Sequence, residues 1–289
     1  MANREATVAI IGGSGLYELE GLGDVEFVEV DTPFGKPSDA IAVGYLEETS
    51  VAFLPRHGQG HRFNPTHIPS QANIYALKSL GVQRIISVSA VGSLKEEFAP
   101  LHLVVPNQII DRTRQRYNTF FDQDMVVHIA FADPFCAPTS QIVHQSAQEL
   151  GITVHPGGTM VVMEGPAFST RAESFMYRSW GADLIGMTAL PEAKLAREAE
   201  ICYATMAWVT DYDCWRQGAE PVTVEMIVQN LLTNVAASKD LLRLVIPRLN
   251  GQRDCLCATA LKDAIITPKD RVSEELKRKL EPIAGRYLS

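Results

Sequence analysis

The chain has 289 residues, of which 46% are hydrophobic and 21% are charged, and its formal net charge is −8. This composition is typical of a globular protein with a substantial core, and the negative charge argues against a nucleic-acid surface or an anionic membrane as the main partner. We find no run long enough for a membrane span and no targeting segment. Five widely spaced cysteines argue against a disulfide framework, so we expect a cytoplasmic protein in which Cys255 and Cys257 are idle thiols, although a strained redox pair is an alternative.

Strand and helix patterns alternate along the chain, which predicts an α/β fold with a mixed central sheet flanked by helices. The expected strands cover residues 7–11, 41–54 (two strands with a turn near residue 47), 84–88, 103–110, 161–163, 184–187 and 201–209. The expected helices cover residues 67–80, 139–150 (with Thr139 as N-cap and Gly151 as the stop), 191–200 and 222–245. We expect one domain over residues 1–289, with a less recognisable helical segment from about residue 250.

A Gly-Gly-Ser-Gly turn at residues 12–15 follows the first expected strand. It matches half of a dinucleotide-binding fingerprint, but Glu18 stands at the position of the third glycine. A new strand begins by Val25, which leaves too little chain for the crossover helix that such a unit needs. We interpret the turn as backbone amides and the Ser14 hydroxyl around a single phosphate, and a tight turn without a ligand is an equally good interpretation.

Polar groups also follow other expected strands. Arg56 offers a planar pair of donors that suits a phosphate, and His57 lies beside it. His57 and His61 have the spacing of a zinc-binding helix, but the glycines between them disfavour a helix, so we expect no metal. A solvated polar loop is the alternative for this segment. The further strand-end positions that add a hydroxyl or an amide are Ser89, Ala90, Met187 and Thr188.

Two carboxylates, Asp211 and Asp213, follow the apolar run at residues 201–209. The carboxyl ends of strands are where open α/β sheets bind ligands. Side chains two residues apart on an extended chain point the same way, so this pair is suited to two adjacent donors on a flat ligand such as adenine. A turn or a solvated loop end remains the alternative for the pair considered alone.

Taken together, the motifs resemble the 5′-methylthioadenosine phosphorylases, in the trimeric branch of the purine nucleoside phosphorylase superfamily. The similar segments are residues 10–16, 31–40, 56–58, 71–74, 164–166, 171–176 and 210–215. The resemblance implies a single-domain phosphorylase-type fold, a homotrimer, a small-molecule nucleoside as substrate and inorganic phosphate as co-substrate. It implies no metal and no organic cofactor.

The resemblance also assigns roles to individual residues. It places Met187 at the ribose hydroxyls and Phe168 beside the sugar or the base. It places Asp211 and Asp213 at the adenine, with Asp211 as the catalytic proton donor, and it lets His128 reach into a neighbouring subunit's site. The phosphate ligands that it implies are Ser14, Arg56, His57, Ser89, Ala90 and Thr188.

Three positions distinguish this chain from relatives that act on 6-oxopurines. Those relatives carry Glu at the position of Ser169, Asn at that of Asp211 and His at that of Val224. The Asp pair would accept hydrogen bonds from the adenine amino group and a protonated N7, and Val224 would offer an apolar wall to a methylthio group. We therefore expect phosphorolysis of 5′-methylthioadenosine to adenine and 5-methylthioribose 1-phosphate, a step of methionine and purine salvage. The alternatives are a phosphorylase that prefers inosine or methylthioinosine, and a non-catalytic nucleoside-binding protein.

Overall fold

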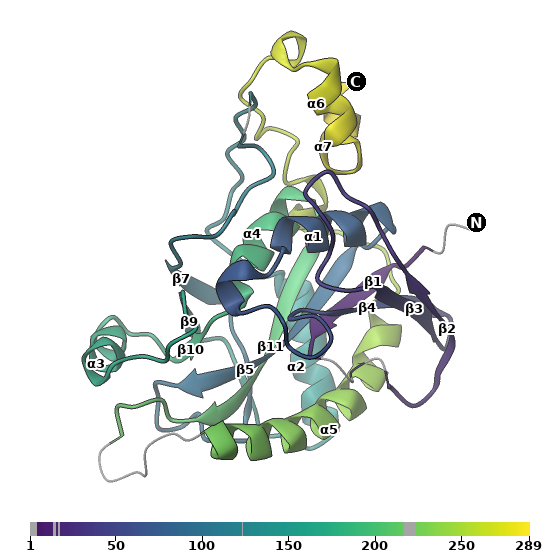
Figure 1. Cartoon of the computed structure of the whole chain (residues 1–289). Coiled ribbons are helices and arrows are strands. Elements are labelled where there is room, and N and C mark those ends of the chain that lie inside the picture. Colours follow the sequence, from purple (N-terminus) through teal and green to yellow (C-terminus); the bar gives the residue numbers. More distant parts are fainter. Residues whose placement is uncertain (1–4, 14–15, 17, 123, 217–223) are drawn as a thin grey trace.

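The structure of the protein is a computed structural model that describes residues 5–13, 16, 18–122, 124–216 and 224–289, apart from the side chains of residues 224–228 and 231. Within these residues, eleven strands join in one mixed sheet with helices on both faces, which confirms the predicted fold class (Figure 1). The strands are β1 (Val8–Gly12), β2 (Leu22–Val28), β3 (Ile41–Leu46), β4 (Thr49–Pro55), β5 (Arg84–Ser93), β6 (Leu103–Val105), β7 (Gln108–Arg112), β8 (Val154–Pro156), β9 (Thr159–Met163), β10 (Leu184–Gly186) and β11 (Cys202–Asp211). The α-helices are α1 (Ser70–Ser79), α2 (Ala137–Glu149), α3 (Arg171–Ser179), α4 (Ala189–Glu198), α5 (Val224–Arg248), α6 (Glu274–Lys279) and α7 (Glu281–Leu288). Short 3-10 turns cover η1 (Pro65–His67), η2 (Leu256–Thr259) and η3 (Lys269–Arg271).

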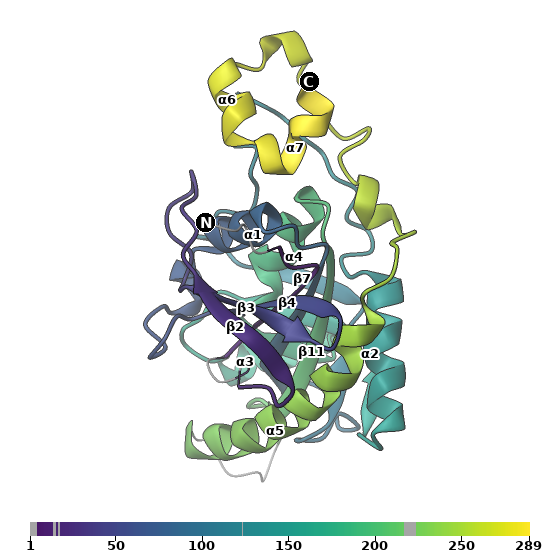
Figure 2. The ribbon, with the colours of Figure 1, turned by 90° about the vertical axis from the view of Figure 1, so that its right-hand side faces the viewer.

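Strand β1 shows why the sheet is covered on both faces. All of its residues are buried, and successive side chains of a strand point to opposite faces. Ala9 and Ile11 belong to the core cluster that includes side chains of α1 and α4, whereas Val8 and Ile10 belong to the cluster that includes side chains of α2 and α5. Helices α1 and α4 therefore cover one face of the sheet and helices α2 and α5 the other, as Figure 2 shows.

The sheet divides at β5. The first part of β5 lies between β1 and β11 and runs parallel to both. Its end, at Gly92 and Ser93, pairs with the antiparallel β10, from which the sheet continues through β9 to β7. Because β1, β4, β5 and β11 are parallel, their carboxyl ends meet at one edge, close to where the short β10 ends. This division of the sheet positions the candidate site.

The sequence predicted most of these elements, and two of its predictions were wrong. Residues 103–110 form two strands rather than one, since Pro106 lacks the N–H that a continuous ladder needs and lies between β6 and β7. Helix α2 begins earlier than expected, after Cys136 instead of Thr139. The Thr139 hydroxyl donates to the Cys136 sulfur at 3.2 Å, so it does not cap the helix. Helix α3 and strand β8 were not predicted.

The C-terminal residues contact the rest of the chain at one end of the molecule, where α6 and α7 stand beyond α1 (Figure 1). The Tyr75 hydroxyl of α1 donates to the Lys279 carbonyl at 3.1 Å. The segment that follows Asp122 lies against the C-terminal residues, since the His128 amide donates to the Ala264 carbonyl at 2.9 Å. One domain over residues 1–289 remains a prediction. Among the described residues, no helix has both the length and the apolar character needed to cross a membrane.

Candidate active site

Arg56 is fixed at the point where β4 ends. Its amide donates to the Gly12 carbonyl at the end of β1, at 2.9 Å. Its guanidinium is buried and donates to the carbonyls of Ile11 (3.1 Å) and Val88 (3.0 Å) and to the Ser87 hydroxyl (2.7 Å). Three neighbouring strands thus hold one cationic side chain in a single orientation, which is the condition for a preorganised anion site.

A buried carboxylate balances the charge of Arg56. Glu192, in α4, accepts from Arg56 Nε at 2.6 Å and from Nη2 at 3.3 Å, and it also accepts from the Tyr203 hydroxyl at 2.9 Å. Burial lowers the pKa of Arg56, but the Glu192 carboxylate outweighs burial and raises that pKa overall. Breaking a buried ion pair by removing one partner costs about 3–5 kcal/mol of stability. The pair with Glu192 therefore stabilises the fold around Arg56 and also keeps its side chain charged.

Hydroxyl groups continue the polar surface from Arg56 toward the end of β10. The Ser87 and Ser89 hydroxyls lie 3.5 Å apart, and the Ser89 and Thr188 hydroxyls lie 3.1 Å apart. Ala90, the next residue on β5, is exposed. The structure thus brings together Arg56, Ser89 and Thr188, which three separate segments supply.

His57 is held as a neutral ring. Its Nδ1 lies 2.8 Å from the Phe63 carbonyl, which can only accept, so Nδ1 carries the proton and Nε2 keeps a lone pair. Burial, followed by the positive charge of Arg56, lowers the pKa of His57 to about 4. The ring stacks on that of His61 with centroids 4.1 Å apart, which is a ring contact and not a metal-binding arrangement on a helix. A neutral Nε2 can accept a hydrogen bond from a protonated phosphate oxygen.

The shifted pKa of His57 predicts a pH dependence of stability. Between pH 6.5 and about pH 4 the unfolded chain binds a proton at His57 that the folded chain does not, so the free energy of unfolding falls as the pH falls through this window. The loss reaches at most about 3 kcal/mol at pH 4. We expect the His57→Gln variant to lack this component, which urea unfolding of both proteins from pH 7 to pH 4 measures. Equal slopes for the two proteins would contradict the prediction.

Asp211 and Asp213 lie together at the end of β11, but not in the way the sequence suggested. Asp213 has a φ of 50°, in the left-handed region, so the chain turns after Asp211 and the argument from an extended chain was wrong. Asp211 Oδ1 accepts from the Asp213 amide at 2.8 Å, and Oδ2 accepts from the Thr210 hydroxyl at 2.8 Å. A turn that closes on the first carboxylate therefore brings the two side chains together.

A glycine and two asparagines shape the surroundings of the pair. A Cβ on Gly92 would lie 3.0 Å from Ile185 Cγ2, 3.2 Å from Asp211 Oδ1 and 3.5 Å from the Asp213 Cβ, so a side chain there would press on the Asp211 carboxylate. Asn230 donates to the Thr210 carbonyl at 2.7 Å, and Asn234 donates to the Val209 carbonyl at 3.3 Å. Helix α5 thereby holds the backbone at the end of β11 in place.

Burial raises the pKa of both carboxyl groups. For Asp211 the hydrogen bonds from Thr210 and from the Asp213 amide oppose this rise without cancelling it. For Asp213 burial is again the largest cause, and the negative charge of Asp211 adds to it. Groups with a raised pKa beside a ligand site are suited to share or donate a proton near neutral pH.

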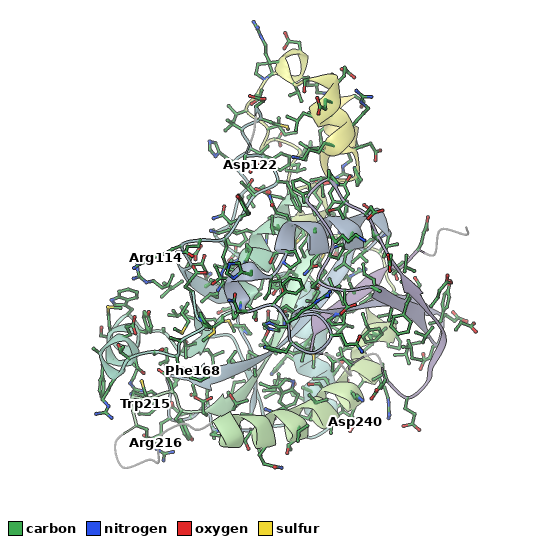
Figure 3. All side chains as sticks on the ribbon, in the orientation of Figure 1. Arg114, Asp122, Phe168, Trp215, Arg216 and Asp240 are labelled. Atoms are coloured by element: carbon green, nitrogen blue, oxygen red, sulfur yellow. The ribbon has the colours of Figure 1, made fainter. Side chains whose placement is uncertain are left out.

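The loop that follows β9 borders both parts of the site. Gly165 has a φ of +70°, and a Cβ there would lie 2.6 Å from the Met187 sulfur. The Cys214 thiol donates to the Ser169 carbonyl at 3.3 Å, which holds Ser169 against the turn that carries Asp213. Phe168 is 59% exposed and projects from the same loop, as Figure 3 shows. An exposed ring at the margin of a site is available to cover a bound ligand.

Arg116 joins this loop to the end of β10. Its side chain is buried, and Nη1 donates to the carbonyls of Met187 (2.5 Å) and Leu190 (2.6 Å). Its Nη2 donates to the Glu164 carbonyl at 2.6 Å, and its Nε donates to the Glu164 carboxylate at 3.1 Å. Burial raises the pKa of Glu164, but its hydrogen bonds, those from the Arg114 amide first, reverse the effect and bring the pKa to about 2. Arg116 therefore positions Met187 and Thr188 without occupying the site.

The sequence did not identify Arg116 or Glu192. Glu192 did carry a usable signal, since it stands among Leu190, Ala193 and Leu195 on a helix that packs on the sheet. A carboxylate on an apolar helix face requires a buried cation nearby, and Arg56 provides it. For Arg116 we find no comparable signal, because its partners are backbone carbonyls that come together only in the folded chain.

Three predicted site residues are not joined to this cluster by the structure. Ser14 and the side chain of Val224 lie outside the described residues. His128 is exposed, in the segment that contacts the C-terminal residues.

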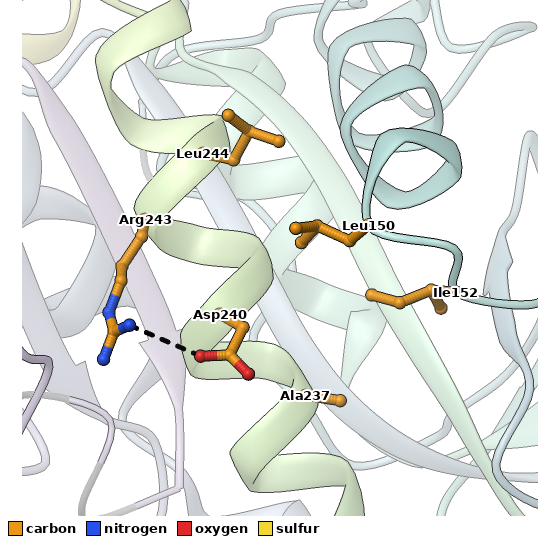
Figure 4. A pocket seen from close by; sticks show the side chains of 6 residues that line it. All are labelled: Leu150, Ile152, Ala237, Asp240, Arg243 and Leu244. Carbon is orange, nitrogen blue, oxygen red and sulfur yellow. Dashed lines mark ion pairs between the residues drawn. The ribbon is translucent and has the colours of Figure 1, made fainter.

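A shallow groove lies elsewhere on the surface, between the end of α2 and the middle of α5 (Figure 4). An ion pair of 3.5 Å between Arg243 and Asp240 lies along it. None of the side chains that line the groove has a predicted role, and we assign no ligand to it. The lining residues are Leu150, Ile152, Ala237, Asp240, Arg243 and Leu244.

Comparison with known proteins agrees with this geometry. The family model described as "Phosphorylase superfamily" matches residues 7–247, so the chain belongs to the phosphorylase superfamily. Among named relatives, the S-methyl-5′-thioadenosine phosphorylase of Geobacter sulfurreducens is 54% identical over 98% of this chain and 100% of that protein. The protein of the same name from Chloroflexus aurantiacus is 53% identical over 98% of this chain and 99% of its own.

Solved structures give the same result. A methylthioadenosine phosphorylase sourced from an Antarctic soil metagenomic library superposes with a TM-score of 0.93 and 46% identity, over 97% of this chain and 99% of its own. The methylthioadenosine phosphorylase from Schistosoma mansoni in complex with adenine has a TM-score of 0.83 and 36% identity, over 89% of this chain and 96% of its own. The resemblance inferred from the sequence motifs is therefore confirmed.

Proposed function

We propose that this protein catalyses the phosphorolysis of 5′-methylthioadenosine to adenine and 5-methylthioribose 1-phosphate. Full-length relatives with more than half of their residues identical bear the name of that activity. The observation that carries the proposal is the half-buried Asp211–Asp213 pair, which lies beside Gly92 of the strand that also supplies Ser89. A base site next to an oxyanion site is what cleavage of a nucleoside by phosphate requires.

Phosphate would bind at the carboxyl ends of β4 and β5. Arg56 supplies a fixed N–H toward the anion, because Nη1 carries two hydrogens and makes one hydrogen bond to the described residues, to the Val88 carbonyl. Ser89 and Thr188 would add hydroxyl donors, and His57 would accept from the protonated oxygen of the phosphate. The amide of Ala90 and the hydroxyl of Ser14 would complete the ligand set in this proposal.

The base would bind at the end of β11, with Phe168 over the sugar or the base and Met187 at the ribose hydroxyls. Asp213 would accept from the adenine amino group. A phosphate oxygen forms the new bond to C1′ while the bond from C1′ to N9 breaks and its electrons pass to the purine. Asp211 would donate or share a proton at N7, which neutralises the leaving base. These groups supply both acid catalysis and positioning, so the proposal includes no metal or organic cofactor in the reaction.

We also propose a homotrimer in which His128 contributes to a neighbouring subunit's site. The support is that His128 is exposed and that it stands on a segment which extends with the C-terminal residues away from the sheet (Figures 1 and 3). Sedimentation equilibrium tests the trimer, and mixing His128→Ala chains with Asp211→Ala chains tests the shared site. Recovery of activity in the mixture supports sharing, whereas two variants that stay as inactive together as apart contradict it.

We further propose a cytoplasmic location, which the five cysteines without a disulfide support.

Specificity for the 5′ substituent gives a further prediction. An apolar side chain at Val224 favours a methylthio group over a hydroxyl by about 1–3 kcal/mol, or about 10–200-fold in kcat/KM. Adenosine should therefore be a measurable but poorer substrate, and Val224→His should narrow or reverse the difference. Initial rates on both nucleosides for both proteins provide the measurement. Equal kcat/KM values for the wild-type protein would contradict an apolar 5′ pocket.

The identity of the sugar product tests the reaction type. With methylthioadenosine and phosphate, ³¹P NMR should show loss of inorganic phosphate and the appearance of a sugar 1-phosphate in equal amounts with adenine. Release of adenine with the phosphate signal unchanged would identify a hydrolase instead. Binding of the nucleoside with no adenine released would favour the non-catalytic alternative.

A further inference from the structure

Four cysteines lie together at the end of the sheet opposite the candidate active site. Cys136 precedes α2, Cys202 begins β11, and Cys255 and Cys257 belong to the segment that follows α5. Their sulfur atoms all lie within 4.8 Å of one another, and those of Cys202 and Cys255 are 3.2 Å apart. The remaining cysteine, Cys214, is near Asp213 and is not part of this cluster.

The backbone explains why the four sulfurs converge. The Cys136 amide donates to the Tyr203 carbonyl at 2.8 Å, so the residue before α2 lies beside the start of β11. Leu256 is 87% exposed, while the residues on either side of it turn their sulfur atoms inward. Figure 2 shows the chain leaving α5 and rising past α2 toward α6 and α7. Segments from three distant parts of the sequence thus each present thiols to one point.

The cluster is largely enclosed by the protein. The Thr139 hydroxyl donates to the Cys136 sulfur at 3.2 Å, so this sulfur acts as an acceptor in the structure. Cys136, Cys202 and Cys257 are buried, whereas Cys255 is partly exposed and leaves a path for an ion to enter.

The spacing fits a tetrahedral metal site. Four sulfurs at about 2.3 Å from a zinc ion lie about 3.8 Å from one another, a value inside the range of the cluster. We propose that Cys136, Cys202, Cys255 and Cys257 bind one structural Zn²⁺ ion. Four protein ligands leave no open position, so the ion has no part in the reaction. Binding releases the thiol protons to solvent and forms four zinc–sulfur bonds without any change of oxidation state.

The site would attach the C-terminal segment to the sheet. From Cys202 to Asp211, β11 extends about 30 Å, at about 3.3 Å per residue, so the ion is remote from the proposed chemistry. Glu200 already holds the same segment, since it accepts from the Leu261 amide at 3.0 Å and from the Tyr287 hydroxyl at 2.7 Å. A metal bound by Cys202, two residues after Glu200, would add metal–sulfur bonds that link β11 to the segment that carries α6 and α7. This assignment does not depend on the proposed reaction.

Metal analysis of the full-length protein tests the proposal. The reduced protein, purified without chelator, should contain about one Zn²⁺ per chain by mass spectrometry of the metal. Cys255→Ser and Cys257→Ser should contain about none, whereas Cys214→Ser, a matched loss of one thiol outside the cluster, should keep the ion. Anaerobic replacement by Co²⁺ should give thiolate-to-cobalt charge-transfer bands and the intense visible bands of a tetrahedral site. A chelator should lower the melting temperature of the wild-type protein by roughly 5 °C or more.

Several results would overturn the proposal. One is a zinc content that is the same in the Cys255 and Cys257 variants as in the wild type, which would mark adventitious metal. Another is a reduced wild-type protein that gives no cobalt–thiolate bands. A third is a thiol titration of the denatured, unreduced protein that finds disulfides within the cluster together with no metal bound by the reduced form. The wild-type cobalt spectrum keeps the test valid even where a serine variant fails to fold.

Discussion

Replacement of Asp213 by Asn should change the ratio of kcat/KM for methylthioadenosine to that for methylthioinosine by up to about 10⁴-fold. Asp213 is the acceptor that the proposal assigns to the adenine amino group, and an asparagine presents a donor that suits the O6 of a 6-oxopurine. Ser169 is held against the same turn by Cys214, and it has no carboxylate that could take over the role of Asp213 as an acceptor. Initial rates on both nucleosides at saturating phosphate give the ratio.

A matched variant separates this effect from a general loss of structure. Asp254→Asn makes the same chemical change at an exposed position in the C-terminal segment, and it should leave the ratio as it is. If Asp213→Asn keeps the wild-type preference for methylthioadenosine, the role assigned to Asp213 is wrong.

Replacement of Asp211 by Ala should lower kcat by about 10²-fold or more, because it removes the proposed proton donor to N7. The wild-type kcat should fall as the pH rises through the raised pKa of Asp211, since only the protonated carboxyl can donate. Asp211→Asn keeps the size of the side chain and should lose this limb of the pH profile.

A purely structural role for Asp211 would give another pattern. The Asp213 amide and the Thr210 hydroxyl both donate to this carboxylate, so its loss could disturb the turn. In that case KM would rise while kcat falls, and the pH profile of Asp211→Asn would match that of the wild-type protein in shape. Thermal melting of both variants shows whether the fold is retained.

Residue patterns predicted the parts of the site that follow from local rules. An apolar run followed by polar residues identifies the end of a buried strand, and parallel strands bring such ends to one edge of a sheet. This reasoning identified Arg56, Ser89 and Asp211 as polar residues at the ends of buried strands, where ligands bind. The structure agrees, because β5 and β11 are parallel neighbours, and β4 is joined to β5 through β1, which is parallel to both.

Other features required the folded chain. The left-handed turn at Asp213 is formed by a hydrogen bond back to Asp211, and periodicity carries no signal for it. The pairing of Arg56 with Glu192 joins residues 136 positions apart. The four-cysteine cluster likewise joins Cys255 and Cys257, which we expected to be idle thiols, to two cysteines that are distant in the sequence. Long-range contacts between polar groups are therefore what a single sequence conceals.

The most direct test of the account is the rate of adenine release from methylthioadenosine with and without phosphate, measured beside methylthioinosine. We predict release that depends on phosphate and saturates with it, with methylthioadenosine strongly preferred. Equal release in phosphate-free buffer, or a preference for methylthioinosine, would contradict the proposal that this protein is an adenine-specific phosphorylase.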